Sequence, residues 1–593
     1  MAATDSAQSS WGIRRMVRGI GSILKAQLVG TNASEDVEVC DSFDLLDGEM
    51  REVSLGEGRG KALLSKVNGT HYATSHLCPH AKAPLVKGTI SKDGRIVCPW
   101  HGACFSATTG DIEESPSIDA LHSFPVKEAN GKVYVEVSNW EHVKQGRRIP
   151  KCVKRRGDAK ATVVIVGGGG AGFAAAETLR LEGFNGKIVL LTSEPYLPID
   201  RPKLSKSMKT TASKIALRDA AHYETMQIDV RLSSRVTRVN TKTRAVEYVS
   251  TNNEPPAPFD LTYSFLILAS GTVPRVLKGS AGFKNVHTLR TVSDSNAIED
   301  AVQLARETAM LQDANAKPNL VIVGTGFIGM EAAAAFSKTC NVTVIGSTPF
   351  KQSLGDQVGL AMAKLHESNG VSLKLNIGIQ ALEADGGDGS QVGHVVLNDG
   401  QRIAVQVLVA GIGSIPATDY LTDSGICVDS DGGVSVDTST RVSGHENVFA
   451  VGDIARYPYH ITGESVRVEH WAVAQNQGRT AAQNIMRLIS AYDPSSVTLI
   501  PFTAIPFFWT VQYGKSLRFA GHAKNFDEIY VDGSLDVANL SFVAYYACEG
   551  RILAISSMGG DPIVAHGSEL IRLGKMPGLD AVKGGLDILG LSL

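Results

Sequence analysis

Four residues near the start of the chain have the types and the spacing of metal ligands. Cys78 and His80 stand in Cys-Pro-His. Cys98 and His101 stand in Cys-Pro-Trp-His, and seventeen residues separate His80 from Cys98. A Rieske 2Fe-2S cluster takes two thiolates on one iron and two imidazoles on the other, which suits one Cys and one His on each of two loops. Zinc ligands usually come as Cys-Cys and His-His pairs instead, so zinc and a degenerate site without metal are the weaker alternatives.

The residues that follow Cys98 and His101 also indicate a Rieske domain. The run 102–110, from Gly102-Ala103-Cys104-Phe105 to Thr109-Gly110, closely resembles Rieske domains. Cys104 within it could pair with another cysteine, as in some Rieske domains. No cysteine with suitable flanking residues is evident, so we expect Cys104 to be a buried free thiol and not a ligand.

A glycine-rich turn follows an apolar strand expected at 162–166. It reads Gly167-Gly168-Gly169-Gly170-Ala171-Gly172 and opens a helix expected at 173–182. This is G-x-G-x-x-G in the context that binds a dinucleotide, where glycines let the backbone approach a pyrophosphate at the helix N-terminus. Glu194 follows the next expected strand, where an acid accepts hydrogen bonds from a ribose. The residues expected at this dinucleotide are Gly167, Gly169, Ala171, Gly172 and Glu194.

A second fingerprint, Gly324-Thr325-Gly326-Phe327-Ile328-Gly329, lies between an expected strand at 319–323 and an alanine-rich helix. Its Gly324, Gly326 and Gly329 should hold a pyridine nucleotide. The next expected strand ends in Gly346 and Ser347, at the point where an acid would select NADH and a base NADPH. No acid stands there and the nearest base is Lys351. Both NADH and NADPH therefore remain candidates.

Three further segments resemble the flavin-binding elements of reductases. They are 266–271, ending in Ala269-Ser270-Gly271; 448–453, ending in Asp453; and 200–206, which contains Arg201 and Lys206. Ser270 departs from the usual threonine but keeps a hydroxyl. With Arg467-Val468-Glu469-His470-Trp471 and Pro506-Phe507-Phe508-Trp509, these segments make the chain similar to the pyridine-nucleotide ferredoxin-reductase superfamily. The Rieske module in front makes it resemble the apoptosis-inducing-factor-like group with a fused Rieske domain.

The resemblance implies FAD in the first unit and assigns further residues to it. It implies that Asp453 binds the flavin ribitol and that His470 and Trp471 lie near the isoalloxazine. It also implies that Trp509 approaches the flavin from the C-terminal domain, although core packing is the alternative for both tryptophans. The whole set that the resemblance places at FAD is Arg201, Lys206, Val236, Ala269, Gly271, Arg290, Asp453, Glu469, His470, Trp471 and Trp509.

Glu331 lies near the start of the helix after the second fingerprint. A carboxylate there is favoured by the helix dipole alone. The resemblance implies instead an ion pair with Lys206 beside the flavin N5, and it makes these two residues, with His470 and Trp471, the catalytic candidates. Related disulfide reductases carry a C-x4-C pair on the helix after the first fingerprint. This chain has no cysteine there, so we do not expect two-electron exchange with a thiol substrate.

Length and periodicity place these motifs in a multidomain chain. Three or four domains are expected for 593 residues. Short alternating strands predict a small all-β Rieske domain, and strand-helix alternation predicts two doubly wound α/β domains, for FAD and for NAD(P). Later strands and a closing helix predict an α+β C-terminal domain. The expected divisions are a basic leader at 1–35, the Rieske domain at 36–143, a linker at 144–160, the FAD domain at 161–285 and 431–495, the NAD(P) insert at 286–430, and the C-terminal domain at 496–593.

Composition narrows the setting. A net charge of -2 offers no footprint for nucleic acid, and no apolar run of roughly 18 residues predicts a membrane span. The eight cysteines are too scattered for a disulfide framework, which favours a reducing, intracellular compartment. The first 28 residues are amphipathic and Arg-rich, with Asp5 the single acid. This pattern is typical of a mitochondrial presequence or a membrane-surface helix, with a packed helix as the alternative. We therefore expect a mitochondrial or cytoplasmic protein.

These expectations combine into one function with two rivals. We expect a flavoprotein reductase that takes hydride from NADH or NADPH and passes single electrons to its own Rieske centre. A flavin can accept a two-electron hydride and can release electrons one at a time. Rieske potentials of roughly -150 to +300 mV suit such an acceptor. One rival is a redox-sensing or cell-death protein whose turnover is incidental. The other is an electron-supply subunit for a separate oxygenase or assimilatory reductase. The final acceptor, a protein or a small molecule, and the oligomeric state, a homodimer included, stay open.

Overall fold

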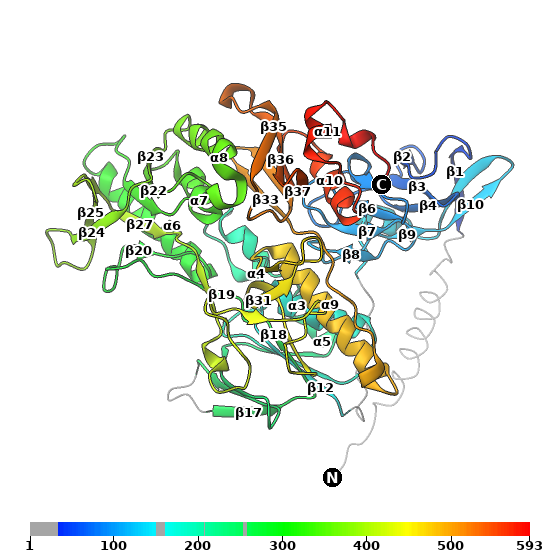
Figure 1. Cartoon of the computed structure of the whole chain (residues 1–593), viewed down its shortest axis with the longest axis horizontal. Helices are drawn as coiled ribbons and strands as arrows, with labels where there is room; N and C mark the ends of the chain where they lie inside the picture. The colour runs from blue at the N-terminus through cyan, green and yellow to red at the C-terminus, as the bar shows by residue number, and fades with distance from the viewer. Residues whose placement is uncertain (1–33, 150–159, 207, 253–257) are drawn as a thin grey trace, which may run out of the picture.

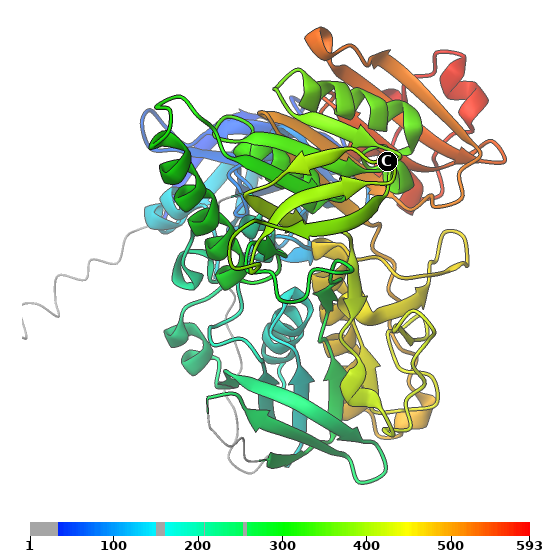
Figure 2. The same cartoon turned by 90° about the vertical axis from the view of Figure 1, so that its left-hand side faces the viewer.

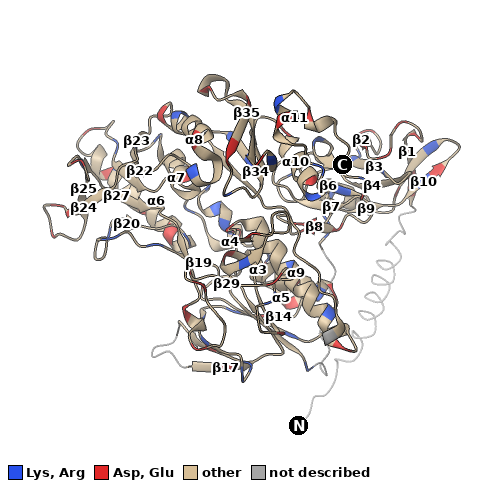
Figure 3. Cartoon of the chain, in the orientation of Figure 1, with Lys and Arg blue, Asp and Glu red and all other residues tan. Residues whose placement is uncertain are grey.

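The computed structural model describes residues 34–149, 160–206, 208–252 and 258–593. The predicted leader up to residue 33 and residues 150–159 of the predicted linker lie outside these ranges. The predicted fold class is confirmed, since an all-β part, two α/β parts and a C-terminal α+β part are present (Figure 1). Within these ranges no helix combines the length and the apolar character needed to cross a membrane. Lysine and arginine are interspersed with aspartate and glutamate over all four parts (Figure 3).

The all-β part is built from three small antiparallel sheets, β1-β11-β10, β2-β3-β4-β9 and β5-β6-β7-β8. Strand β3 lies between two cores, because alternate side chains of a strand point to opposite faces. Leu63 belongs to the core around the expected cluster ligands and Leu64 to the other. Helix α2 contains residue 144, at which the linker was expected to start. The elements are β1 (Glu35–Asp41), β2 (Met50–Ser54), β3 (Lys61–Val67), β4 (Thr70–Ser75), β5 (Thr89–Ile90), β6 (Arg95–Val97), β7 (Cys104–Ser106), β8 (Ile112–Glu114), β9 (Ser123–Phe124), β10 (Val126–Ala129), β11 (Lys132–Val137) and α2 (Trp140–Gln145).

The first α/β part has a parallel sheet in the order β14-β13-β12-β18-β30. Helices α3 and α9 pack closely together because Gly478 has no side chain, and a Cβ there would lie 2.2 Å from the carbonyl oxygen of Ala171. The carboxyl ends of β12 and β18 meet at one edge, where a ligand of an open α/β sheet binds. The elements are β12 (Thr162–Val166), α3 (Gly170–Leu181), β13 (Lys187–Leu191), α4 (Ala212–Ile215), α5 (Ala220–Thr225), β14 (Ile228–Arg231), β15 (Ser234–Asn240), β16 (Ala245–Ser250), β17 (Pro258–Thr262), β18 (Phe265–Leu268), β29 (Val434–Ser435), β30 (Val448–Ala450), β31 (Ala455–Pro458), β32 (Ser465–Val466) and α9 (Trp471–Ser490).

The second α/β part is inserted into the first and repeats its plan, with the sheet order β20-β27-β21-β22-β23. The chain enters and leaves the insert through β19 and β28, which pair with each other. It rejoins the first part before the expected boundary at 430, since Tyr420, Leu421 and Ile426 are buried in the core of that part. The elements are β19 (Thr272–Pro274), β20 (Val286–His287), α6 (Val292–Met310), β21 (Asn319–Val323), α7 (Phe327–Phe336), β22 (Asn341–Gly346), α8 (Lys351–Glu367), β23 (Ser372–Leu375), β24 (Ile379–Ala384), β25 (Val392–Leu397), β26 (Arg402–Ala404), β27 (Val407–Ala410) and β28 (Ser414–Pro416).

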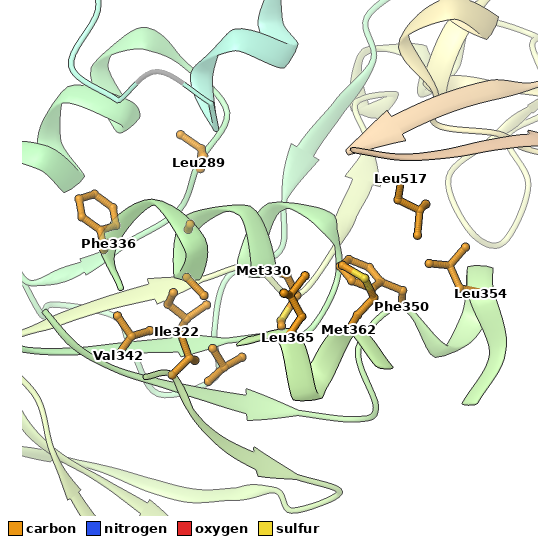
Figure 4. Close-up of a cluster of buried hydrophobic side chains, with 14 of the residues drawn as sticks. Leu289, Ile322, Met330, Phe336, Val342, Phe350, Leu354, Met362, Leu365 and Leu517 are labelled. Atoms are coloured by element: carbon orange, nitrogen blue, oxygen red, sulfur yellow. The ribbon is translucent and has the colours of Figure 1, made fainter. Parts of the chain in front are cut away.

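The C-terminal part is an antiparallel sheet, β33-β34-β37-β36-β35, followed by two helices. It shares a hydrophobic core with the insert: Leu517 of β34 packs in one cluster with Leu354 and Met362 of α8 (Figure 4). In the turned view the insert lies beside this sheet and above the first α/β part (Figure 2). The elements are β33 (Phe507–Gln512), β34 (Lys515–Gly521), β35 (Glu528–Ser534), β36 (Ser541–Cys548), β37 (Arg551–Met558), α10 (Ile563–Arg572) and α11 (Leu579–Lys583).

Candidate flavin and iron-sulfur site

The four expected cluster ligands are brought together on two neighbouring loops. Cys78 and His80 lie on the loop after β4, and Cys98 and His101 on the loop between β6 and β7. The Nδ1 atoms of the two histidines are 3.0 Å apart. The two thiols are hydrogen-bonded to each other, which raises the pKa of Cys78 and lowers that of Cys98. The donors thus form a nitrogen pair and a sulfur pair, as two irons require, and the described residues hold no group of three or more His, Cys, Asp or Glu arranged around a single ion.

Both imidazoles are set to coordinate metal as neutral rings. Burial lowers the pKa of His101 to about 3, with further lowering by His80, Arg518 and Lys206. Burial also lowers the pKa of His80. A neutral ring keeps the lone pair that a metal ligand needs. Cys104 is buried and free, as predicted, and burial raises the pKa of its thiol.

Strand β33 of the C-terminal part forms a wall beside the ligand loops. The ring centroid of Trp509 lies 4.3 Å from that of His101 and 5.8 Å from that of His80. Gly102 has φ +71°, and a Cβ there would lie 2.6 Å from the Phe507 ring. Phe507 and Trp509 therefore face the cluster side, while Phe508, on the opposite face of the strand, packs edge-to-face on His470 at 4.8 Å.

This arrangement gives Trp509 neighbours that the resemblance did not indicate. Its expected contact with the flavin stays a prediction. The structure puts its ring against the two histidine ligands, and Trp509 is not among the residues that line the flavin cavity. The reason is the alternation of β33, which turns every second side chain away from the neighbouring α/β parts. No sequence signal specifies which face of a strand meets which neighbour.

A cavity opens at the carboxyl edge of the first parallel sheet. The start of α3 forms one wall, and the turns after β18 and β30 form another. Nine of the residues expected at FAD line it. They are Gly169, Ala171, Arg201, Ala269, Gly271, Arg290, Asp453, Glu469 and Trp471.

The glycine fingerprint is built for a dinucleotide. A Cβ at Gly167 would lie 2.1 Å from the carbonyl oxygen of Ala269, and one at Gly172 would lie 2.0 Å from that of Gly167. Neither position tolerates a side chain, so the turn stays tight and the N-terminus of α3 faces the cavity with its free N–H groups. Arg290 and Arg201 also line this cavity, and cationic side chains together with a helix N-terminus suit the anionic pyrophosphate of FAD.

Asp453 lies opposite Arg290, with 3.6 Å between Oδ2 and Nη2. Thr272 also donates to this carboxylate, at 3.4 Å. Burial raises the pKa of Asp453, and Arg290 opposes that shift. A largely buried carboxylate that lines the cavity is a suitable acceptor for the hydroxyls of a ribitol chain, and that role stays a prediction.

Two residues expected at FAD are placed less directly. Glu194 follows β13, where Arg201 donates to both of its carboxylate oxygens, at 3.0 and 2.9 Å. Its role with a ribose stays a prediction, in which Arg201 would share the carboxylate. Val236 lies on β15 and packs against the core of the first α/β part, not along the cavity.

His470 and Trp471 mark the start of α9. A Cβ at Gly170 would lie 2.9 Å from the Trp471 ring, so this tryptophan lies against the fingerprint turn. Burial lowers the pKa of His470 to about 4, and among the described residues its Nδ1 is buried without a hydrogen-bond partner. His470 is not among the residues that line the cavity, although its neighbours Glu469 and Trp471 are, and its place near the isoalloxazine stays a prediction.

The predicted ion pair between Lys206 and Glu331 is present. Lys206 Nζ lies 3.1 Å from Glu331 Oε1, and only 6% of the Glu331 side chain is exposed. Thr510 of β33 donates to the same oxygen at 2.8 Å, and Ser205 donates to Oε2. Glu331 therefore joins the insert, the loop at 200–206 and the C-terminal sheet. Sequence reasoning missed Thr510 and Ser205, because nothing local marks a partner 179 residues away.

The second fingerprint repeats the first in geometry. A Cβ at Gly324 would lie 2.1 Å from the carbonyl oxygen of Gly411, and one at Gly329 would lie 2.2 Å from that of Gly324. Gly326 lies at the start of α7, and a Cβ there would meet nothing within 4 Å. At the end of β22, Gly346 lies against Thr325, and Lys351 is paired with Asp356 at 3.1 Å. The one nearby base is thus partly neutralised, and both nucleotides remain candidates.

Comparisons with known proteins agree with this geometry. The family model described as pyridine nucleotide-disulphide oxidoreductase matches residues 161–478, the Rieske [2Fe-2S] domain matches 35–125, and the reductase C-terminal domain matches 507–583. The chain is 39% identical to apoptosis-inducing factor 3 of Homo sapiens over 91% of this chain and 84% of that protein. It is 30% identical to rhodocoxin reductase of Rhodococcus erythropolis over 67% of this chain and 86% of that protein.

Solved structures show the same likeness. The covalent putidaredoxin reductase–putidaredoxin complex superposes with a TM-score of 0.63 at 27% identity, covering 72% of this chain and 96% of that one. Family matches over three consecutive regions, together with two fingerprints and paired Cys and His ligands, establish FAD, a pyridine nucleotide and a 2Fe-2S cluster as the cofactors. The chain therefore belongs to the pyridine nucleotide-disulphide oxidoreductase family, among the apoptosis-inducing-factor-like flavoproteins with a fused Rieske domain, and is an NAD(P)H-dependent oxidoreductase.

Proposed function

We propose that this oxidoreductase takes hydride from NADH or NADPH and delivers electrons one at a time to its own Rieske centre, which passes them to a further acceptor. When bound, FAD supplies the switch from hydride to single electrons, and the cluster supplies a one-electron acceptor. The remaining steps depend on how this chain positions the two sites.

One observation carries the proposal. A short chain of contacts links the flavin cavity to the histidine ligands. Ser205 lines the cavity and donates to Glu331, which also accepts from Thr510 of β33. Trp509, the residue before Thr510, has its ring centroid 4.3 Å from that of His101. The cavity and the expected cluster ligands are therefore connected through Glu331 and β33.

The chain's own residues prepare this path. Glu331 holds Lys206 and Thr510 at one point, so the insert that carries the nucleotide fingerprint is tied both to the loop at 200–206 and to β33. Phe508 packs on His470 and on Phe327, which keeps water from the contact between β33 and α7. Asp453 and Arg290, which line the cavity, would orient the dinucleotide when it is bound.

The test is an anaerobic titration of the purified full chain with NADH and then NADPH, followed by flavin absorbance and low-temperature EPR. We expect flavin bleaching followed by a Rieske signal, and the nucleotide that acts at the lower concentration identifies the donor. Cys98→Ser should abolish the EPR signal and leave flavin bleaching intact. Cys104→Ala is the matched control, a buried cysteine that is not a ligand, and should keep both signals. A reduced flavin beside a cluster that stays oxidised in the wild-type chain would refute internal transfer and favour the redox-sensing rival.

A further inference from the structure

One segment of the Rieske part, residues 115–119, lies against the two helices that frame the flavin cavity. The backbone N–H of Ser115 donates to Asn476 Oδ1 of α9 at 2.8 Å. At the other end of the segment, Asp119 is 3% exposed. Its carboxylate meets an arginine from the first α/β part.

That arginine is Arg218, from the stretch between α4 and α5, and it is 8% exposed. Its Nη1 donates to Asp119 Oδ1 at 2.6 Å and its Nη2 donates to the carbonyl oxygen of Ile118 at 2.7 Å. Its Nε donates to Glu177 Oε1 at 2.8 Å, and Glu177 belongs to α3. One planar guanidinium thus holds both the Rieske segment and the helix whose N-terminus faces the flavin cavity.

The chemistry of this contact gives it a fixed geometry. Three donors of one rigid group are used on three acceptors, so Arg218 cannot move without breaking at least one bond. The group is buried, and a buried charge that loses one partner is left unpaired at high cost, so a displaced segment is disfavoured. Surface ion pairs on the Rieske part do not fix a geometry in this way, because exposed partners can replace their contacts with each other by contacts with water.

We propose that Arg218 is a positioning residue that, with Asp119 and Glu177, holds the Rieske domain in register with the flavin helix α3 and so fixes the flavin-to-cluster separation. This inference rests on the proposed electron transfer within the chain. It assigns to the first α/β part a docking role beyond binding FAD. The rate of electron transfer falls steeply with the separation of the two centres, so loss of this three-residue clamp should slow the transfer even when the fold is intact.

The test compares two rates in the anaerobic full chain by stopped flow: bleaching of the flavin by NADH or NADPH, and appearance of the reduced-cluster spectrum. In Arg218→Leu and in Asp119→Asn we expect flavin bleaching at the wild-type rate and cluster reduction slowed severalfold. Arg218→Lys, which keeps the charge and loses the fork, should lie between them and the wild type. Hydrogen exchange of peptides that cover 115–119 should rise in the same order.

Arg147→Ala is the matched control. Arg147 donates to the other oxygen of the same carboxylate, at 3.1 Å, but it belongs to the Rieske side of the chain and its side chain is 54% exposed. Its removal should change neither rate. Unchanged cluster reduction and unchanged hydrogen exchange in both folded clamp variants would overturn the inference. Absence of cluster reduction in the wild-type chain would instead overturn the proposed function, so the two failures are distinguishable. If Arg218→Leu does not fold, Asp119→Asn and Arg218→Lys test the positioning role in its place.

Discussion

Replacement of Glu331 by glutamine tests the junction of three parts of the molecule. The carboxylate accepts hydrogen bonds from Lys206, Ser205 and Thr510, and its side chain is 6% exposed. Glutamine has nearly the same shape but no charge, so it removes the ion pair and leaves the packing in place. One of its two terminal atoms becomes a donor, which forces Ser205 or Thr510 to reverse its hydroxyl.

The size of the effect follows from the partners. A hydrogen bond to a charged group contributes about 1.5–3 kcal/mol to the free energy of unfolding, and a hydroxyl that turns round loses little. The Lys206 side chain is 29% exposed, so the lower half of that range applies. We expect Glu331→Gln to lower the free energy of unfolding by about 1.5–2 kcal/mol. We also expect slower flavin bleaching by NADH, because Lys206 is no longer held beside the flavin cavity.

Urea unfolding and stopped-flow bleaching measure the two effects. Lys209→Met is the matched control: it removes an ion pair of 3.1 Å to Asp300 just after the same loop, but both side chains are more than 60% exposed. Its effect on unfolding should stay below about 1 kcal/mol and its bleaching rate should be unchanged. The reasoning is refuted if Glu331→Gln unfolds within about 0.5 kcal/mol of the wild type and bleaches at the same rate.

Three further outcomes are expected. Trp509→Ala should slow cluster reduction and leave flavin bleaching unchanged, because it removes two ring contacts with the histidine ligands, of about 0.5–1.5 kcal/mol each. Stopped flow should show a smaller effect for Trp509→Phe, which keeps an aromatic ring. Gly102→Ala should lower the free energy of unfolding in urea by about 1–3 kcal/mol, and Phe507→Ala should recover part of that loss, since φ is +71° and the new Cβ meets the Phe507 ring. Burial lowers the pKa of His366 to about 4 from 6.5. The contribution of neutral His366 to the free energy of unfolding is therefore fully present above pH 6.5 and is lost as the pH falls, by about 2 kcal/mol at pH 5. Urea unfolding of His366→Gln should therefore show a smaller loss of unfolding free energy between pH 7 and pH 5 than the wild type.

The parts of the site that depend on local geometry were predictable from the sequence. Gly167 and Gly324 each directly follow a buried strand, at positions where a side chain would clash with a neighbouring carbonyl oxygen. Glycine is therefore required in the two turns where the dinucleotides are expected to bind. Cys78 and Cys98 lie in short turns whose own residues fix the direction of the ligands. Such signals are contained in runs of about six residues and need no knowledge of the rest of the chain.

The parts that depend on contacts between domains were not predictable. Arg218 and Asp119 are 99 residues apart, and neither lies in a motif, so their pairing appears only when the Rieske part is packed on the first α/β part. The motif around Trp509 marks it as a site residue but does not identify its neighbour, because the face of β33 that it occupies is set by the packing of the whole C-terminal sheet. The strand-helix pattern likewise marks the insert but does not show that Tyr420 already packs in the first part.

The paired strands β19 and β28 have a mechanical consequence. They are the two points at which the chain passes between the first α/β part and the insert, and Val273 lies opposite Ile415 in their ladder. The C-terminal sheet shares the core of the insert, so the second fingerprint and Trp509, which contacts the two histidine ligands, belong to one packed unit. The β19–β28 ladder and the Lys206–Glu331 pair both connect that unit to the first α/β part.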